Sequence, residues 1–118
     1  MLRLPCSVRV FLCLVPVDMR RSFDGLAAMV EQVVCEEPLS GHLFVFRGRR
    51  GDRLKILWWD KDGYALWYKR LEAGVFRFPP VPAGAERCEC TSADLSLILD
   101  GIDVRSVKRE KRFSLSSR

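Results

Sequence analysis

Apolar residues in the first third of the chain follow first a strand pattern and then a helix pattern. The segment Val8–Val15 is short and rich in β-branched and aromatic residues, and it stops at Pro16, which predicts a strand. After Ser22, a residue type preferred at helix N-caps, apolar residues recur at the spacing of one helical face until Pro38 and Gly41. We therefore expect a strand followed by the main helix.

The middle of the chain changes to a strand pattern. Two apolar runs flank the loop Gly48–Arg53, and a short polar segment between two glycines is typical of a β-hairpin. Further turns at Asp60–Gly63 and Glu72–Gly74 separate two more runs of strand type. The four strands are expected at 43–47, 54–59, 64–69 and 75–78. Strands joined by such short turns form an antiparallel meander.

A proline-rich connector and a short helix follow. Pro79 and Pro80 cannot continue a central strand. Thr91 or Ser92 can cap a helix, which Gly101 ends. The predicted fold is α+β: a single small domain at residues 1–103 with an antiparallel meander sheet of about five strands. We expect the main N-terminal helix and the short C-terminal helix to pack on the same face of that sheet.

The net charge of +5 is concentrated at the C-terminus. Residues 104–118 hold six basic side chains against Glu110, so residues 1–103 are neutral overall. We expect this basic tail to be flexible. A solvated terminus and a nucleic-acid contact both fit its charge.

Cysteine and histidine usage narrows the class of protein. The odd count of five cysteines without a CxxC pair argues against a secreted disulfide framework and fits reduced thiols in the cytoplasm. His42 is the single histidine, so no cluster of His ligands can form. Pro5 and Arg9 interrupt the apolar start, which we interpret as a buried strand and not as a signal peptide. No run is long enough for a membrane helix.

The sequence names no catalytic group. Asp60 and Asp62 fit a turn, and Asp18 and Asp24 fit a helix N-terminus, so these carboxylates need no catalytic explanation. No phosphate-binding glycine motif and no nucleophile motif is present. We therefore expect no enzyme, no metal, no cofactor and no small-molecule substrate.

The tip of the hairpin is the strongest nucleic-acid signal. Five basic residues against Asp52 give a local charge of +4. These five are Arg47, Arg49, Arg50, Arg53 and Lys55. Arginines on a β-ribbon can bind phosphate oxygens or guanine edges in a bidentate manner. An ordinary solvated turn, kept from edge-to-edge pairing by its arginines, explains the same pattern equally well.

Aromatic residues gather beside Lys69 and Arg70. They are Trp58, Trp59, Tyr64, Trp67 and Tyr68. Exposed aromatic rings among basic residues can stack on unpaired bases or anchor a protein partner. Because neighbouring strand residues face opposite sides, we expect most of these rings to belong to the core.

Three segments closely resemble one family of small bacterial proteins. They are Val17–Val30 (VDMRRSFDGLAAMV), Gly41–Pro79 (GHLFVFRGRRGDRLKILWWDKDGYALWYKRLEAGVFRFP) and Leu97–Asp103 (LILDGID). In this order they resemble the accessory protein TnpB of the IS-sixty-six group of bacterial insertion sequences, and not the RNA-guided nuclease of the same label. The tail beyond Arg105 diverges from the family. The resemblance therefore directs attention to the hairpin.

The resemblance implies a helper of transposition that acts beside a separate DDE-type transposase. Two hypotheses follow for such a non-catalytic factor. In the first, it binds DNA at the ends of the insertion sequence or in a transposase-held complex. The DNA-binding residues are then Arg47, Arg49, Arg50, Arg53, Lys55, Lys69 and Arg70. In the alternative, it docks on the transposase without touching DNA, and the partner-binding residues are Arg20, Trp58, Trp59 and Trp67.

Overall fold

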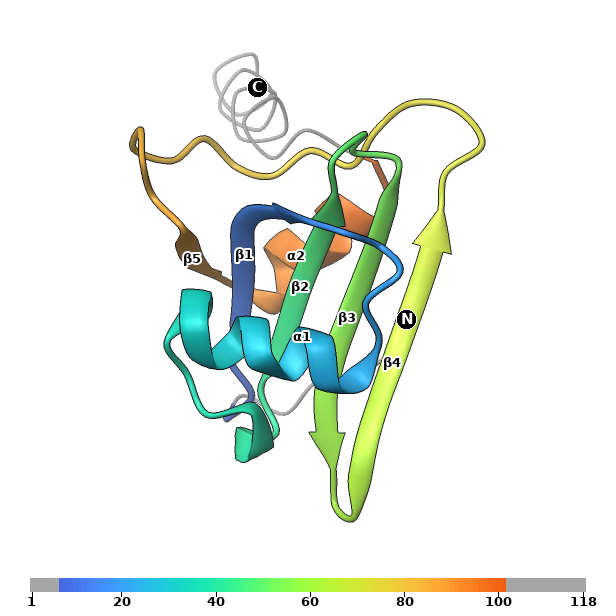
Figure 1. Ribbon diagram of the computed structural model, residues 1–118. Coiled ribbons are helices and arrows are strands. Elements are labelled where there is room, and N and C mark those ends of the chain that lie inside the picture. The colour runs from blue at the N-terminus through green and yellow to red at the C-terminus, as the bar shows by residue number, and fades with distance from the viewer. Residues whose placement is uncertain (1–6, 102–118) are drawn as a thin grey trace, which may run out of the picture.

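The computed structural model describes residues 7–101. They form one five-stranded sheet with a helix on each side (Figure 1). The strands are β1 (Val10–Val17), β2 (Leu43–Gly48), β3 (Arg53–Asp60), β4 (Gly63–Arg70) and β5 (Arg87–Cys90), and the α-helices are α1 (Phe23–Met29) and α2 (Ser92–Leu99). A π-helical segment, Val30–Val34, continues α1, and a short 3-10 turn covers Pro38–Ser40. The α+β class, the main helix and the short C-terminal helix are thus confirmed.

The sheet is mixed, with the strand order β4-β3-β2-β1-β5. The predicted hairpins are correct, because β2, β3 and β4 pair antiparallel in sequence order. The expectation of a purely antiparallel sheet was wrong, because β1 pairs parallel with β2. Parallel neighbours need a long crossover connection, and the segment containing α1 provides it.

The fifth strand is β5 and not the predicted strand at 75–78. The chain after β4 crosses the end of the sheet, where Gly74 adopts a positive φ and Phe76 is buried. Pro79 and Pro80 then prevent a ladder from continuing, since neither has an N–H to donate. The chain returns as β5 on the far edge, antiparallel to β1. Its sequence, RCEC, carries no strand pattern that would have predicted this.

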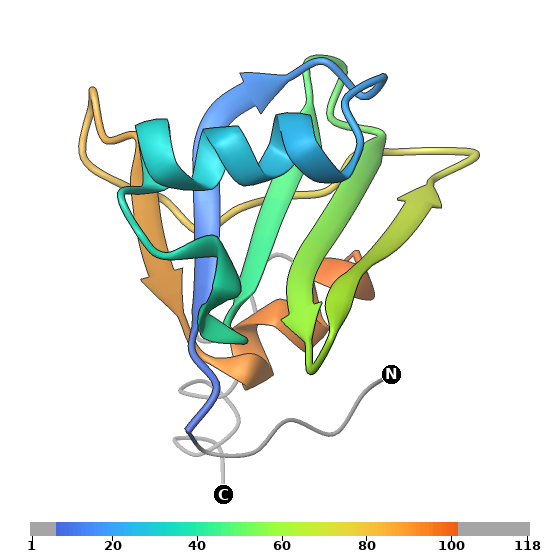
Figure 2. The ribbon, with the colours of Figure 1, turned by 60° about the horizontal axis from the view of Figure 1, so that its bottom comes forward.

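The two helices cover opposite faces of the sheet, so the prediction of a shared face was wrong (Figures 1 and 2). On the face covered by α1, hereafter the α1 face, Phe11, Phe44 and Leu57 pack with Leu26 and Val30. The opposite α2 face has its own core. Its buried residues are Val10, Leu12, Leu43, Val45, Leu54, Ile56, Phe76, Leu95, Ile98 and Leu99. Both faces of β1 and β2 are therefore buried, and their apolar runs need no polar alternation.

Local signals place both helices. α1 begins after Ser22, as expected, although the Ser22 side chain makes no capping hydrogen bond. α2 begins with a capping box, in which the Thr91 hydroxyl accepts from the Asp94 amide and the Asp94 carboxylate accepts from the Thr91 amide. Asp100 is the C-cap, and Gly101 follows with φ 76°. The predicted tail at 104–118 lies outside the described residues.

The loop between β2 and β3 is tied to the body of the protein. Its turn closes with the amide of Gly51 donating to the carbonyl of Gly48 at 3.0 Å. The segment after β4 then binds the loop from the side. The amide of Phe76 donates to the Gly51 carbonyl at 2.7 Å, and the amide of Leu71 donates to the Asp52 carbonyl at 2.8 Å. The segment after β4 thus anchors the loop at Gly51 and Asp52.

Gly51→Ala is expected to lower the free energy of unfolding by about 1–3 kcal/mol, because a side chain is strained in the left-handed region. Gly51 has φ 80°, and an added Cβ would lie 3.2 Å from the Val75 Cβ. Urea denaturation of the whole chain measures the change. Gly63→Ala in the same pair of hairpins is the control, since nothing lies within 4 Å of its added Cβ. Equal stability of the two variants would contradict the anchored loop.

Candidate nucleic-acid interface

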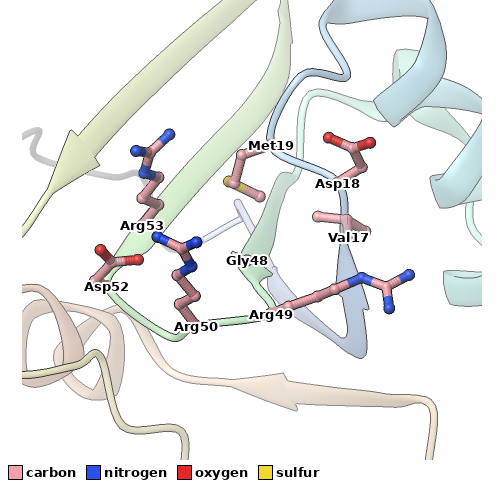
Figure 3. A pocket seen from close by; sticks show the side chains of 8 residues that line it. All are labelled: Val17, Asp18, Met19, Gly48, Arg49, Arg50, Asp52 and Arg53. Atoms are coloured by element: carbon pink, nitrogen blue, oxygen red, sulfur yellow. The ribbon is translucent and has the colours of Figure 1, made fainter.

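A pocket of about 360 Å³ opens where the loop between β2 and β3 meets the end of β1 (Figure 3). Its walls carry opposite charges from two parts of the chain. The lining residues are Val17, Asp18, Met19, Gly48, Arg49, Arg50, Asp52 and Arg53. In Figure 3, Arg50 and Arg53 extend in the same direction, whereas Arg49 extends past Val17 of β1. Three of the predicted DNA-binding residues therefore lie together.

The three pocket arginines remain available to a ligand. Arg49 and Arg50 are exposed, and Arg53 is half-buried. Within residues 7–101, none of the ion pairs involves any of the three. Arg53 makes one side-chain hydrogen bond, from Nη1 to the Tyr68 hydroxyl at 3.3 Å. Among the described residues, these three guanidinium groups are thus not held in ion pairs.

Lys55 lies inside the protein and not on the predicted DNA-binding surface. Its side chain is 6% exposed on the α1 face. The Nζ atom donates to the carbonyl oxygens of Met19 at 2.7 Å and of Arg21 at 2.8 Å. These carbonyls belong to the connection between β1 and α1. The ammonium group therefore fastens that connection to the hairpin, and a phosphate cannot reach it without breaking these bonds.

Met19 completes this fastening. Its side chain lies directly over Gly48, since a Cβ added at Gly48 would come within 2.9 Å of the Met19 Cγ. Only glycine leaves room for such a close approach. The wall of the pocket thus depends on two contacts of Met19. Gly48 of β2 leaves room for its side chain, and its carbonyl accepts the hydrogen bond from Lys55.

Arg47 also serves the protein's own packing. It is half-buried on the α2 face, where Nη1 donates to the Phe76 carbonyl at 3.0 Å. Its guanidinium lies 4.2 Å from the centre of the Phe78 ring, a cation–π distance. Burial lowers the pKa of Arg47. This arginine holds the segment after β4 against the sheet.

The last two predicted DNA-binding residues face opposite sides of the sheet. Arg70 lies directly across from Arg53 on the α1 face, and it pairs with Glu72 at 3.0 Å. Lys69 lies across from Leu54, which belongs to the α2 face. Both side chains are exposed. Only Arg70 therefore shares a surface with Arg53.

The predicted partner-binding tryptophans are all half-buried. Trp58 and Trp67 pack against the core of the α2 face. Trp59 meets Tyr64 edge to face, with 5.2 Å between the ring centres. The structure thus distributes the three rings over two faces and does not bring them together.

Arg20 is the most exposed of the predicted partner-binding residues, with 92% of its side chain accessible. It pairs with Asp18 at 2.7 Å. The hydrogen bonds from Arg20 hold the pKa of the Asp18 carboxyl well below its usual range. Asp18 and Met19 line the pocket but were not among the predicted site residues. Their place in the segment Val17–Val30, which carries the family resemblance, was the available signal.

Comparison with known proteins identifies the family. The family model described as IS66 Orf2 like protein matches residues 8–109, which is most of the chain. The chain belongs to this family. The match confirms the resemblance to the accessory protein of IS-sixty-six insertion sequences, and it implies an accessory role in transposition.

Two relatives of the family member come from Sinorhizobium fredii (strain NBRC 101917 / NGR234). The uncharacterised protein y4jC is 41% identical over 104 residues, covering 88% of this chain and 87% of y4jC. The uncharacterised protein y4hO is 44% identical over 99 residues, covering 84% of each chain. No solved structure matches the chain. Among the described residues, no helix is long and apolar enough to cross a membrane.

Lys55→Met is expected to lower the free energy of unfolding by about 2–4 kcal/mol, because the carbonyl groups of Met19 and Arg21 lose a charged donor that is buried in the protein. Urea denaturation of the whole chain measures the loss. Lys69→Met removes the same ammonium from an exposed site in β4 and should change stability by less than about 0.5 kcal/mol. If the two variants were equally stable, Lys55 would not be the fastening described above.

Proposed function

We propose that this member of the IS66 Orf2-like family is a non-catalytic transposition factor that binds DNA. Arg49, Arg50, Arg53 and Arg70 meet phosphates of the DNA backbone in this proposal. The DNA is an end of the insertion sequence, either free or held by the transposase. Membership of this family supports a role in transposition, because the family is associated with the transposition machinery.

One observation carries the DNA contact. Arg49, Arg50 and Arg53 gather at one tip, and no ion pair within residues 7–101 neutralises them. Arginine forks bind phosphate oxygens through two parallel hydrogen bonds.

The other basic residues that the sequence predicted to bind DNA have different roles in this proposal. Lys55 and Arg47 fix the two flanks of the tip from inside the protein. Lys69 faces the opposite side of the sheet from Arg53 and Arg70. These three residues are therefore not among the proposed DNA contacts. The four arginines that remain lie on one side of the protein.

The alternative function is docking on the DDE-type transposase without direct DNA contact. It would use Arg20 and the tryptophans as anchors. Trp58, Trp59 and Trp67 are already engaged with the protein's own residues, so no observation favours them as a joint anchor. A protein that co-purifies with the transposase after nuclease treatment, and that shifts no DNA by itself, would establish this alternative.

The DNA affinity of the Arg49→Ala/Arg50→Ala double variant is expected to depend less steeply on salt. Each phosphate contact contributes a slope of about −0.9 in a plot of log affinity against log salt concentration for a duplex, so the slope should become shallower by about 2. Fluorescence anisotropy with a labelled end of the insertion sequence measures it over a series of salt concentrations.

Lys61→Ala provides the matched control for the single variant Arg50→Ala. Both changes remove one positive charge from an exposed position, but Lys61 lies in the turn between β3 and β4, at the opposite end of β3. The slope should change for Arg50→Ala alone. A change of the same size in both variants would mean that only the net charge matters, and the contact assignment would be lost.

A further inference from the structure

An exposed tyrosine lies beside the proposed phosphate contacts. Tyr68 of β4 is 47% exposed and points to the α1 face, opposite Lys55 in the neighbouring strand. By contrast, the three tryptophans of the same sheet are half-buried. Among the aromatic residues of β3 and β4, Tyr68 is therefore the one whose ring is open to a ligand.

The Tyr68 ring is fixed from below and from its edge. The Nζ atom of Lys55 lies 4.7 Å from the ring centre, and that ammonium is itself held by two carbonyl groups. Arg53 donates a hydrogen bond to the Tyr68 hydroxyl. Since the cation occupies one side of the ring, the opposite side forms the open part of a rigid, flat surface.

Two arginines flank this surface. Arg53 and Arg70 lie directly opposite each other on neighbouring strands, on the same face as Tyr68. Like charges in directly opposed positions destabilise a sheet. Glu72 offsets Arg70, but no ion pair within the described part of the chain offsets Arg53. An anion bound between the two guanidinium groups would relieve this repulsion.

A flat aromatic ring next to a pair of guanidinium groups fits a nucleotide whose base is unpaired. Phosphates need only the arginines, and the bases of an intact duplex are stacked on one another and cannot reach the ring. An unpaired base can stack on an aromatic side chain whatever its identity. The open ring therefore adds a preference for DNA with unpaired bases, which the arginines alone do not have.

We propose that Tyr68 is a stacking platform for an unpaired base of a DNA strand whose phosphates lie on Arg53 and Arg70. This inference rests on the proposed DNA-binding function and narrows its substrate to single-stranded or opened DNA. The platform consists of Tyr68 with Lys55 beneath it and the two arginines beside it. The pocket near Asp18 continues the same surface toward the tip of the hairpin.

The test compares a fluorescently labelled single strand with the duplex of the same sequence, using the full chain at one salt concentration. Tyr68→Leu keeps an apolar side chain but removes the ring, and it should weaken single-strand binding about tenfold. Its duplex affinity should stay within about twofold of the original. Tyr68→Phe keeps the ring and should bind the single strand nearly as well as the original chain.

Tyr64→Leu is the matched control, because Tyr64 lies on the same strand and face but packs against Trp59. It should not change the ratio of the two affinities. Ultraviolet crosslinking of a strand that contains iodouracil should join the base to Tyr68, which mass spectrometry of the original chain can locate. This second measurement does not depend on whether the leucine variant folds.

Equal losses for single strand and duplex, or a crosslink elsewhere with none at Tyr68, would overturn the stacking platform. The DNA-binding function would stand in that case, because duplex binding with its salt dependence would persist. If neither form of DNA bound to the original chain, the DNA-binding function itself would fall, and the platform with it.

Discussion

The buried ammonium group of Lys55 is the interaction on which the rest of the site depends. A charged side chain at a core position is costly unless its donors are satisfied. Here the carbonyls of Met19 and Arg21 satisfy it, and both belong to the connection that leads from β1 into α1. This contact brings the end of β1 to the hairpin, builds the wall of the pocket and supports the ring of Tyr68. One residue thus links the fold to the proposed binding surface.

In this arrangement the basic residues divide into two groups with different roles. Lys55 and Arg47 work inside the protein, each fastening a neighbouring segment to the sheet. Arg49, Arg50 and Arg53 extend from the part so fastened. The net charge of the chain does not reveal this division, because burial and hydrogen bonding decide which cations remain available. A local count of +4 at the tip therefore overstates the charge that can meet a ligand.

Sequence patterns predicted the local elements well. The glycines around the tip marked the hairpin, and Thr91 or Ser92 as a predicted cap marked the start of α2, where the structure has Thr91 as the N-cap. The patterns failed where distant segments meet. Continuous apolar runs in β1 and β2 indicate burial on both faces, yet they do not say which helix covers which face. The pairing of β5 with β1 also depends on a crossing of the sheet end that RCEC does not encode.

The candidate site was predictable only in part, for the same reason. The sequence named Arg53, Arg70 and Lys55 as DNA-binding residues, but it could not show that Lys55 is buried, because its carbonyl partners lie 34 and 36 residues away. The central claim is that the tip and the adjoining α1 face meet DNA. Amide chemical shifts of the labelled chain, recorded during titration with an end of the insertion sequence, test it most directly. The account predicts the largest changes at residues 49–53 and 68–70. Changes centred on α2 or on β5, with none at the tip, would contradict it.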